Sequence, residues 1–176
     1  MNTADRYPFM MIVFHWLIAG AIFVNLIIGW LLDDATELMD LHRTVGTLIL
    51  ALSMLRLFNR FFSRRKIPAS LNTPSSAQHI AEKIAHALLY AAMVAVPLLG
   101  WLKTNSAGHD IVLFDTIPLP SLIGKDHQLS SLFGMAHSIS AYLLAMLIGL
   151  HIAGAIAHQV FGKKDAWHRI IPTLGR

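Results

Sequence analysis

Four histidines lie inside long apolar runs or at the start of one, where a polar ring is costly to bury. His15 lies about seven residues into the first run, and His42 opens the second. His137 and His151 both lie in the fourth run. Imidazole nitrogens bind iron and other transition metals without adding negative charge to an apolar site. These four positions therefore predict metal or cofactor ligation.

The spacing of the last two histidines places them on one side of a helix. His137 and His151 are fourteen residues apart, a rise of about 21 Å and a rotation within roughly 40° of the same face. By depth in the apolar runs, His15 pairs with His151, and His42 pairs with His137. Two facing imidazole pairs suit two haems with two histidine ligands each, because helical bundles build cofactor sites from facing helices. A single buried histidine also fits a hydrogen bond between helices or a proton path, but four at matched depths favour ligation.

The absence of cysteine narrows the metal chemistry. A chain with no cysteine has no disulfides, iron–sulfur clusters or thiolate zinc sites, and it cannot attach haem covalently through a C-x-x-C-H motif. Any metal must be held by histidine, carboxylate or methionine. The ten histidines are abundant for so apolar a chain, whereas the eight methionines fit lipid-facing or core positions better than axial ligation.

Composition indicates a membrane protein. The 176 residues are 55% hydrophobic and 14% charged, against about 25% charged in soluble domains. Apolar segments at about 8–32, 41–62, 80–102 and 129–161 are each long enough to cross roughly 30 Å of hydrocarbon. We expect an all-α integral membrane four-helix bundle with two haems in its core, forming one domain over residues 1–176. The segment between the third and fourth spans is expected to be an ordered loop or a short helix at the surface.

Charge placement predicts the orientation in the membrane. Basic residues follow the second span at Arg60, Arg64, Arg65 and Lys66, and the tail is basic as well. The first connection is acidic, with Asp33, Asp34, Glu37 and Asp40. Since basic loops stay on the cytoplasmic side, both termini are expected in the cytoplasm, with lipid around the spans. No basic patch with interleaved aromatics suggests nucleic-acid binding.

Four basic residues are candidates to neutralise haem propionates. Arg43 and Lys103 would serve the periplasmic haem, and Arg56 and Arg60 the cytoplasmic haem. For Arg60, a topology charge and a lipid headgroup contact are a strong alternative. Arg56 lies deeper in its span, where an unpaired charge is costlier.

Two further histidines are candidate contacts for a haem propionate or a quinone. His86 lies one turn before Tyr90 in the third span, where a polar contact within the bundle is the alternative. His158 lies seven residues beyond His151, so it is either at a quinone pocket, interfacial, or a substitute for His151. The remaining histidines lie in loops or at span ends, where solvated rings are expected: His79, His109, His127 and His168. The tryptophans fall mostly near span ends, as an aromatic belt requires.

Several short motifs together resemble one family. They are Phe14-His15-Trp16, Leu41-His42-Arg43, Pro97-Leu98-Leu99-Gly100, Gly149-Leu150-His151 and Ala157-His158. Over nearly its whole length the chain resembles the bacterial cytochrome b561 family of small dihaem membrane cytochromes. The resemblance implies two b-type haems, ligands at His15, His42, His137 and His151, an inner-membrane location and electron exchange with ubiquinone. At least one family member is thought to oxidise superoxide at the periplasmic face.

This chain departs from the family pattern at the periplasmic side. An acidic residue that often follows the fourth-span histidine is Ser138 here. Arg43, Lys103 and Lys125 are the only Lys or Arg residues expected on that side, so a positive field would steer an anion weakly.

The leading hypothesis is a dihaem b-type cytochrome, acting as an oxidoreductase between a periplasmic donor and ubiquinone, with superoxide as the named candidate donor. One alternative is a cytochrome b membrane anchor of a larger respiratory complex, such as a hydrogenase or formate dehydrogenase. Another is a transporter or channel in which histidines relay protons, although Glu82, near a span end, offers little support for a carboxylate relay.

Overall fold

The computed structural model describes residues 6–170, except 33–34, 71, 75 and 162–168. Four long helices make up most of it: α1 (Phe9–Leu31), α2 (Met39–Phe62), α3 (Ala77–Ser106) and α4 (His127–Val160). Each is long and apolar enough to cross a membrane. Short 3₁₀ turns, η2 (Thr36–Leu38) and η3 (Arg64–Lys66), flank α2. The predicted all-α membrane bundle is confirmed, with one small hairpin, β1 (Val112–Leu113) and β2 (Ile117–Pro118), added to it.

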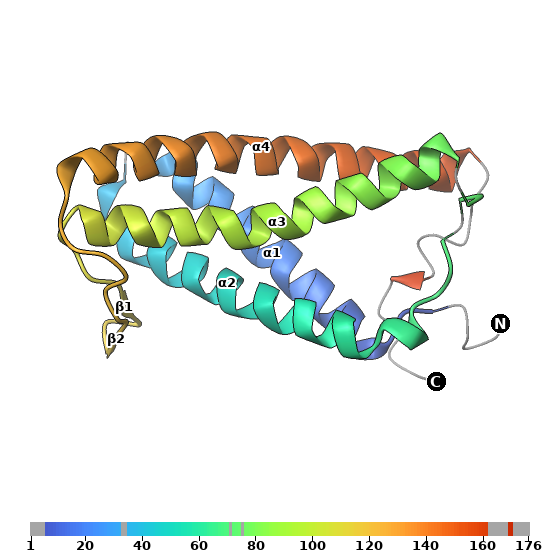
Figure 1. Ribbon diagram of the computed structural model, residues 1–176, viewed down its shortest axis with the longest axis horizontal. Coiled ribbons are helices and arrows are strands. Elements are labelled where there is room, and N and C mark those ends of the chain that lie inside the picture. The colour runs from blue at the N-terminus through green and yellow to red at the C-terminus, as the bar shows by residue number, and fades with distance from the viewer. Residues whose placement is uncertain (1–5, 33–34, 71, 75, 162–168, 171–176) are drawn as a thin grey trace.

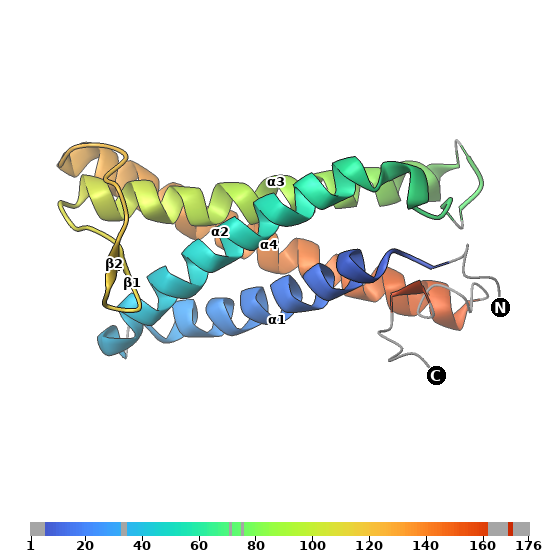
Figure 2. The same ribbon diagram turned by 90° about the horizontal axis from the view of Figure 1, so that it is seen from below.

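The helices alternate in direction along the bundle. Helices α1 and α3 run toward the end that carries the hairpin, and α2 and α4 return from it (Figure 1). We call this the hairpin end; at the other, the Tyr7 end, the Tyr7 N–H donates to the Arg169 carbonyl over 3.4 Å. The closely packed helix pairs are α3–α4, α1–α2 and α2–α3. Figure 2 shows the helices inclined to one another rather than parallel.

Side-chain caps extend two helices beyond the apolar runs that predict them. Ser76 accepts from the His79 N–H at the start of α3 over 3.2 Å. Asp126 accepts from the first N–H groups of α4 at 2.9 and 3.0 Å. Such caps satisfy backbone donors that a helix leaves unpaired at its start. Both helices therefore begin two or three residues before the predicted spans. Helix α4 is about 51 Å long for its 34 residues, more than a hydrocarbon core of about 30 Å needs.

An apolar layer at mid-height joins all four helices. It is made of Ile18, Ile22, Ile49, Met93, Val96 and Leu144. Leu144 is 3% exposed and lies midway between His137 and His151 along α4. The layer therefore separates the two histidine pairs along the bundle axis.

The connection between α3 and α4 is a loop with a hairpin, which is the first of the two predicted alternatives; the short helix is not formed. Val112 pairs with Pro118 and Leu113 pairs with Ile117. Phe114 and Asp115, at φ 51° and 55°, form a turn closed by the Thr116 N–H donating to the Leu113 carbonyl over 3.0 Å. Two successive left-handed residues give the turn a twist that matches a hairpin.

Candidate cofactor sites

The structure brings the four spanning histidines together in two pairs. The ring centroids of His15 and His151 lie 6.4 Å apart, and those of His42 and His137 lie 6.1 Å apart. Two imidazoles on opposite sides of one metal, each bonded at about 2 Å, have centroids about 6 Å apart. Both spacings therefore fit one metal ion between each pair. The partners are those that matched depth predicts.

His137 is held in one tautomer at the hairpin end. Its Nδ1 lies 2.9 Å from the carbonyl oxygen of Val96 on α3. A carbonyl only accepts, so Nδ1 carries the proton and Nε2 keeps the lone pair that a metal needs. Metal-binding histidines usually donate their second nitrogen in this way, and the contact fixes the ring orientation.

Two glycines leave room for the rings of His137 and His42. A Cβ added at Gly100 would lie 3.1 Å from Cε1 and 3.2 Å from Nδ1 of His137. A Cβ added at Gly29 would lie 3.1 Å from Cε1 of His42. Both distances are tighter than ordinary van der Waals contact, so each glycine lets a helix backbone approach an imidazole closely.

A cavity of about 410 Å³ surrounds the His42–His137 pair and is lined by residues of all four helices. Its size falls in the range of small-molecule and cofactor sites, about 300–1,000 Å³. A partly open, mostly apolar space with two imidazoles in its wall would suit a flat macrocycle such as haem.

The polar groups around this cavity include one that the sequence interpretation missed. Arg43 and Lys103 line it as expected, and Arg43 Nη1 also donates to Asp40 over 3.0 Å. Trp101, which the sequence placed in an aromatic belt, lines it as well. Two nitrogens here are buried, Nε of Arg43 and Nε1 of Trp101. Neither has a hydrogen-bond partner among the described residues. Such donors are available to acceptors on a bound group, such as propionate oxygens.

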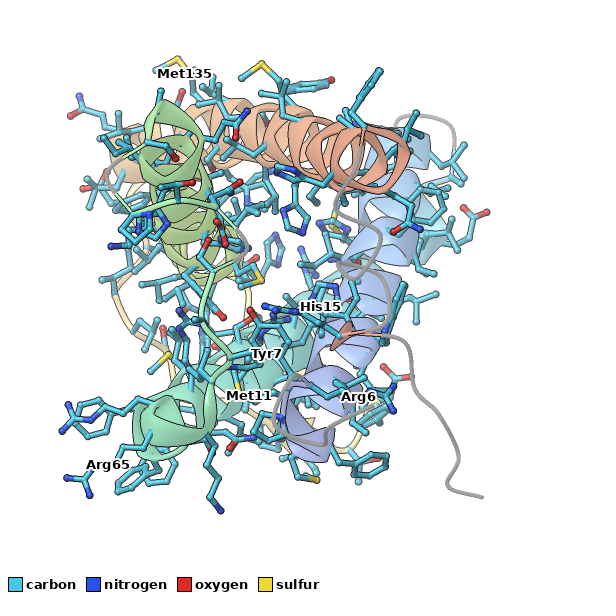
Figure 3. All side chains as sticks on the ribbon, turned by 90° about the vertical axis from the view of Figure 1, so that its right-hand side faces the viewer. Arg6, Tyr7, Met11, His15, Arg65 and Met135 are labelled. Atoms are coloured by element: carbon cyan, nitrogen blue, oxygen red, sulfur yellow. The ribbon has the colours of Figure 1, made fainter. Side chains whose placement is uncertain are left out.

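A third histidine joins the pair at the Tyr7 end. The ring of His86 lies 5.4 Å from that of His151. Its Nδ1 donates to the Glu82 carbonyl over 2.8 Å, so its Nε2 is free to accept a hydrogen bond. Figure 3, seen from this end, shows His15 and Tyr7 directed toward the middle of the bundle. The sequence singled out His86, and its contact with His151 places it beside the pair.

Arg56 and Arg60 both lie over the ring of Tyr90. Their Cζ atoms are 5.6 and 5.4 Å from its centroid, a cation–π arrangement. Arg56 interacts electrostatically with His15 and His151. Its buried Nε has no hydrogen-bond partner in the part of the chain that the structure describes. The Arg56 Nε–H is therefore available to an acceptor on a bound group, and its role toward a haem propionate stays a prediction.

A contact with the C-terminal segment positions the residue beside His15. Trp16 Nε1 donates to the Ile170 carbonyl over 2.8 Å, and the Trp16 and His15 rings lie 5.4 Å apart. Nearby, Arg169 donates to the Ala69 carbonyl over 2.7 Å. Burial raises the pKa of the Tyr7 phenol, and the charge of Arg60 partly offsets this, so Tyr7 is a neutral donor at physiological pH. The hydrogen bond from Trp16 to Ile170 joins residues 154 positions apart, so local sequence patterns do not predict it.

The other candidate histidines remain apart. His158 is half-buried on α4, and it makes no hydrogen bond or ring contact with the described residues around His151. His109 and His127 are exposed at the hairpin end, and His79 lies in the first turn of α3. His168 and Trp167 lie outside the described residues.

Comparisons with known proteins agree on one family. The model of the family described as prokaryotic cytochrome b561 matches residues 6–173. Cytochrome b561 homolog 2 of Escherichia coli is 24% identical, over 97% of this chain and 93% of that protein. The probable superoxide oxidase CybB of Yersinia pestis is 24% identical, over 95% and 96%. Cytochrome b562 of Cereibacter sphaeroides is 27% identical, over 76% and 89%. The chain therefore belongs to the prokaryotic cytochrome b561 family of membrane electron-transfer proteins, which bind b-type haem.

Proposed function

We propose that the chain holds two b-type haems, one at each end of the bundle, and transfers electrons across the inner membrane between a periplasmic donor and ubiquinone. The observation that carries this proposal is the pair of facing imidazoles at each end, with centroid distances of 6.1 and 6.4 Å. His42 and His137 hold one haem, and His15 and His151 the other. When bound, a b-type haem supplies a one-electron iron couple.

The residues of the chain set the properties of each site. Val96 fixes the tautomer of His137. Arg43 and Lys103 neutralise anionic groups at the hairpin end, and Arg56 does so at the Tyr7 end. With two histidines to hold each haem, the chemistry that the haem would supply is outer-sphere electron transfer rather than oxygen binding.

The Tyr7 end is the proposed cytoplasmic side and the quinone side. Basic residues gather there, as the positive-inside rule requires. His86 has a free Nε2 beside His151, which suits a bond to a protonated quinol oxygen; His158 is a second candidate contact on α4. Reduction of ubiquinone takes two electrons and two protons.

Superoxide is the proposed donor at the hairpin end. The similarity to the probable superoxide oxidase CybB of Yersinia pestis supports this choice. Oxidation of superoxide to dioxygen releases one electron, which an outer-sphere site can accept. Arg43 and Lys103 line the cavity, but Arg43 is paired with Asp40, so we expect only weak electrostatic steering of a small anion to this end.

Reconstitution tests the donor and the acceptor together. The purified protein, placed in liposomes with ubiquinone, is exposed to an enzymatic superoxide source while the haem spectrum and ubiquinol are recorded. We expect haem reduction and ubiquinol formation, both abolished by added superoxide dismutase. Haems that stay oxidised in the presence of superoxide would contradict the proposal that superoxide is the electron donor. If they respond only after a partner complex is added, the chain is an anchor subunit instead.

Arg56→Gln should lower the midpoint potential of the haem at the Tyr7 end. Removing a positive charge near the iron stabilises the oxidised form, by on the order of 50 mV for a partly buried charge. A potentiometric titration followed by absorbance measures the shift. Arg65→Gln, which removes an exposed charge at the same end, is the control. Equal shifts in both variants would assign the effect to surface charge in general.

A further inference from the structure

A second groove lies at the Tyr7 end of α2, on the outside of the bundle. It has a volume of about 340 Å³ and is lined by Leu57, Arg60, Phe61, Arg64 and Ile67. Three of these side chains are apolar and two carry guanidinium groups. In Figure 3, Arg65, next to the groove in sequence, points away from the bundle, whereas His15 and Tyr7 point toward the middle of the bundle.

The two arginines of the groove are held in place but keep their hydrogen-bond donors. Arg60 Cζ lies 5.4 Å from the centroid of Tyr90, and Arg64 Cζ lies 5.3 Å from that of Phe61. Stacking on a ring orients a guanidinium while leaving its edge free. Across the described residues, neither arginine has a carboxylate partner or a hydrogen bond to an acceptor. The ion pair among these residues, Arg43–Asp40, lies at the opposite end of α2. Two stacked, unpaired guanidiniums one turn apart make an anion site.

The surface next to these arginines is apolar. Phe58, Phe61 and Phe62 are 65%, 62% and 66% exposed, and the Phe62 ring contacts the rings of both Phe58 and Phe61. On a helix that spans the membrane, exposed aromatic side chains face lipid. The groove therefore lies where the hydrocarbon surface ends and the charged 3₁₀ turn η3, with Arg65 and Lys66, begins.

We propose that this groove binds an anionic phospholipid. Arg60 and Arg64 take the phosphate, because a guanidinium matches phosphate oxygens with two parallel hydrogen bonds. Leu57 and Phe61 take the start of an acyl chain. Basic pockets at the cytoplasmic ends of membrane helices recognise anionic head groups in this way. The proposal goes beyond electron transfer and is independent of which donor the cytochrome uses.

Native mass spectrometry of the complete protein in mild detergent tests the site. The probes are dioleoylphosphatidylglycerol and, as the zwitterionic comparison, dioleoylphosphatidylcholine. We expect tighter binding of phosphatidylglycerol, weakened about fivefold in Arg64→Gln and by about 25-fold in the double variant Arg60→Gln/Arg64→Gln, since each cation contributes roughly that factor. The matched double variant Arg65→Gln/Lys66→Gln removes the same charge from outside the groove and should keep nearly wild-type affinity.

Two results would overturn the proposal. One is equal binding of the two lipids to the wild-type protein. The other is an equal loss in both double variants, which would mean attraction by diffuse surface charge. Excess inorganic phosphate should not displace the lipid; displacement would be a third contradicting result, because it would show a site for free anions rather than lipid. The absorbance spectrum of each variant verifies folding, and Arg64→Gln decides the question alone if the double variant cannot be purified.

Discussion

His137→Ala is expected to purify with about one b-type haem per chain where the wild-type protein holds two. The substitution removes one of the two rings that lie 6.1 Å apart across the hairpin-end cavity, and His42 alone binds haem weakly. The His15–His151 pair lies beyond the apolar layer and should keep its haem. A pyridine haemochrome assay, normalised to protein, gives the number. His151→Ala should show the mirror result, with the hairpin-end haem retained.

His109→Ala is the matched control for this pair of variants. His109 is exposed at the hairpin end, so its removal should leave the haem content unchanged. A His137→Ala protein with the full wild-type haem content and spectrum would refute the assignment of His137 as a ligand.

Gly100→Ala should release haem from the hairpin end at least tenfold faster than the wild-type protein. The new Cβ would lie 3.1 Å from Cε1 and 3.2 Å from Nδ1 of His137. The His137 ring cannot move away without breaking its 2.9 Å hydrogen bond to the Val96 carbonyl. Val96 lies one turn before Gly100 on α3. Loss of such a supporting contact typically costs 10- to 100-fold in metal affinity. Transfer of haem to excess apomyoglobin measures the rate.

Gly20→Ala separates this effect from the general effect of alanine in a helix. Nothing lies within 4 Å of a Cβ added at Gly20, and alanine favours a helix over glycine by about 0.5–1 kcal/mol. Gly20→Ala should therefore release haem no faster than the wild-type protein. If Gly100→Ala also behaves like the wild type, the His137 ring has room to shift and Gly100 is not required for the site.

The histidine pairing could be predicted from sequence because it follows from helix geometry. His137 and His151 share a face through their spacing, and hydropathy gives the depth of His15 and His42. The contacts that hold the rings could not be predicted in this way. The Val96 carbonyl is a backbone group present at every residue, and its choice as the partner of His137 depends on how α3 packs against α4.

Other differences have similarly local causes. The hairpin turn uses Phe114 and Asp115 at positive φ, without the Asn-Gly or Asp-Gly pair that marks such turns in a sequence. Hydropathy started the third and fourth spans two or three residues too late because it ignores caps, although Ser76 and Asp126 are typical capping residues. Trp101 was assigned to an aromatic belt because its position near a span end fits that role as well as it fits a cavity wall.

The number of haems in the purified wild-type protein tests the central claim most directly. Oxidised and dithionite-reduced spectra in mild detergent, combined with a pyridine haemochrome assay, should give two low-spin b-type haems per chain. One haem per chain would contradict the proposal of a site at each end of the bundle. A colourless protein from haem-replete cells would contradict haem binding altogether and make the histidine proton relay the leading explanation.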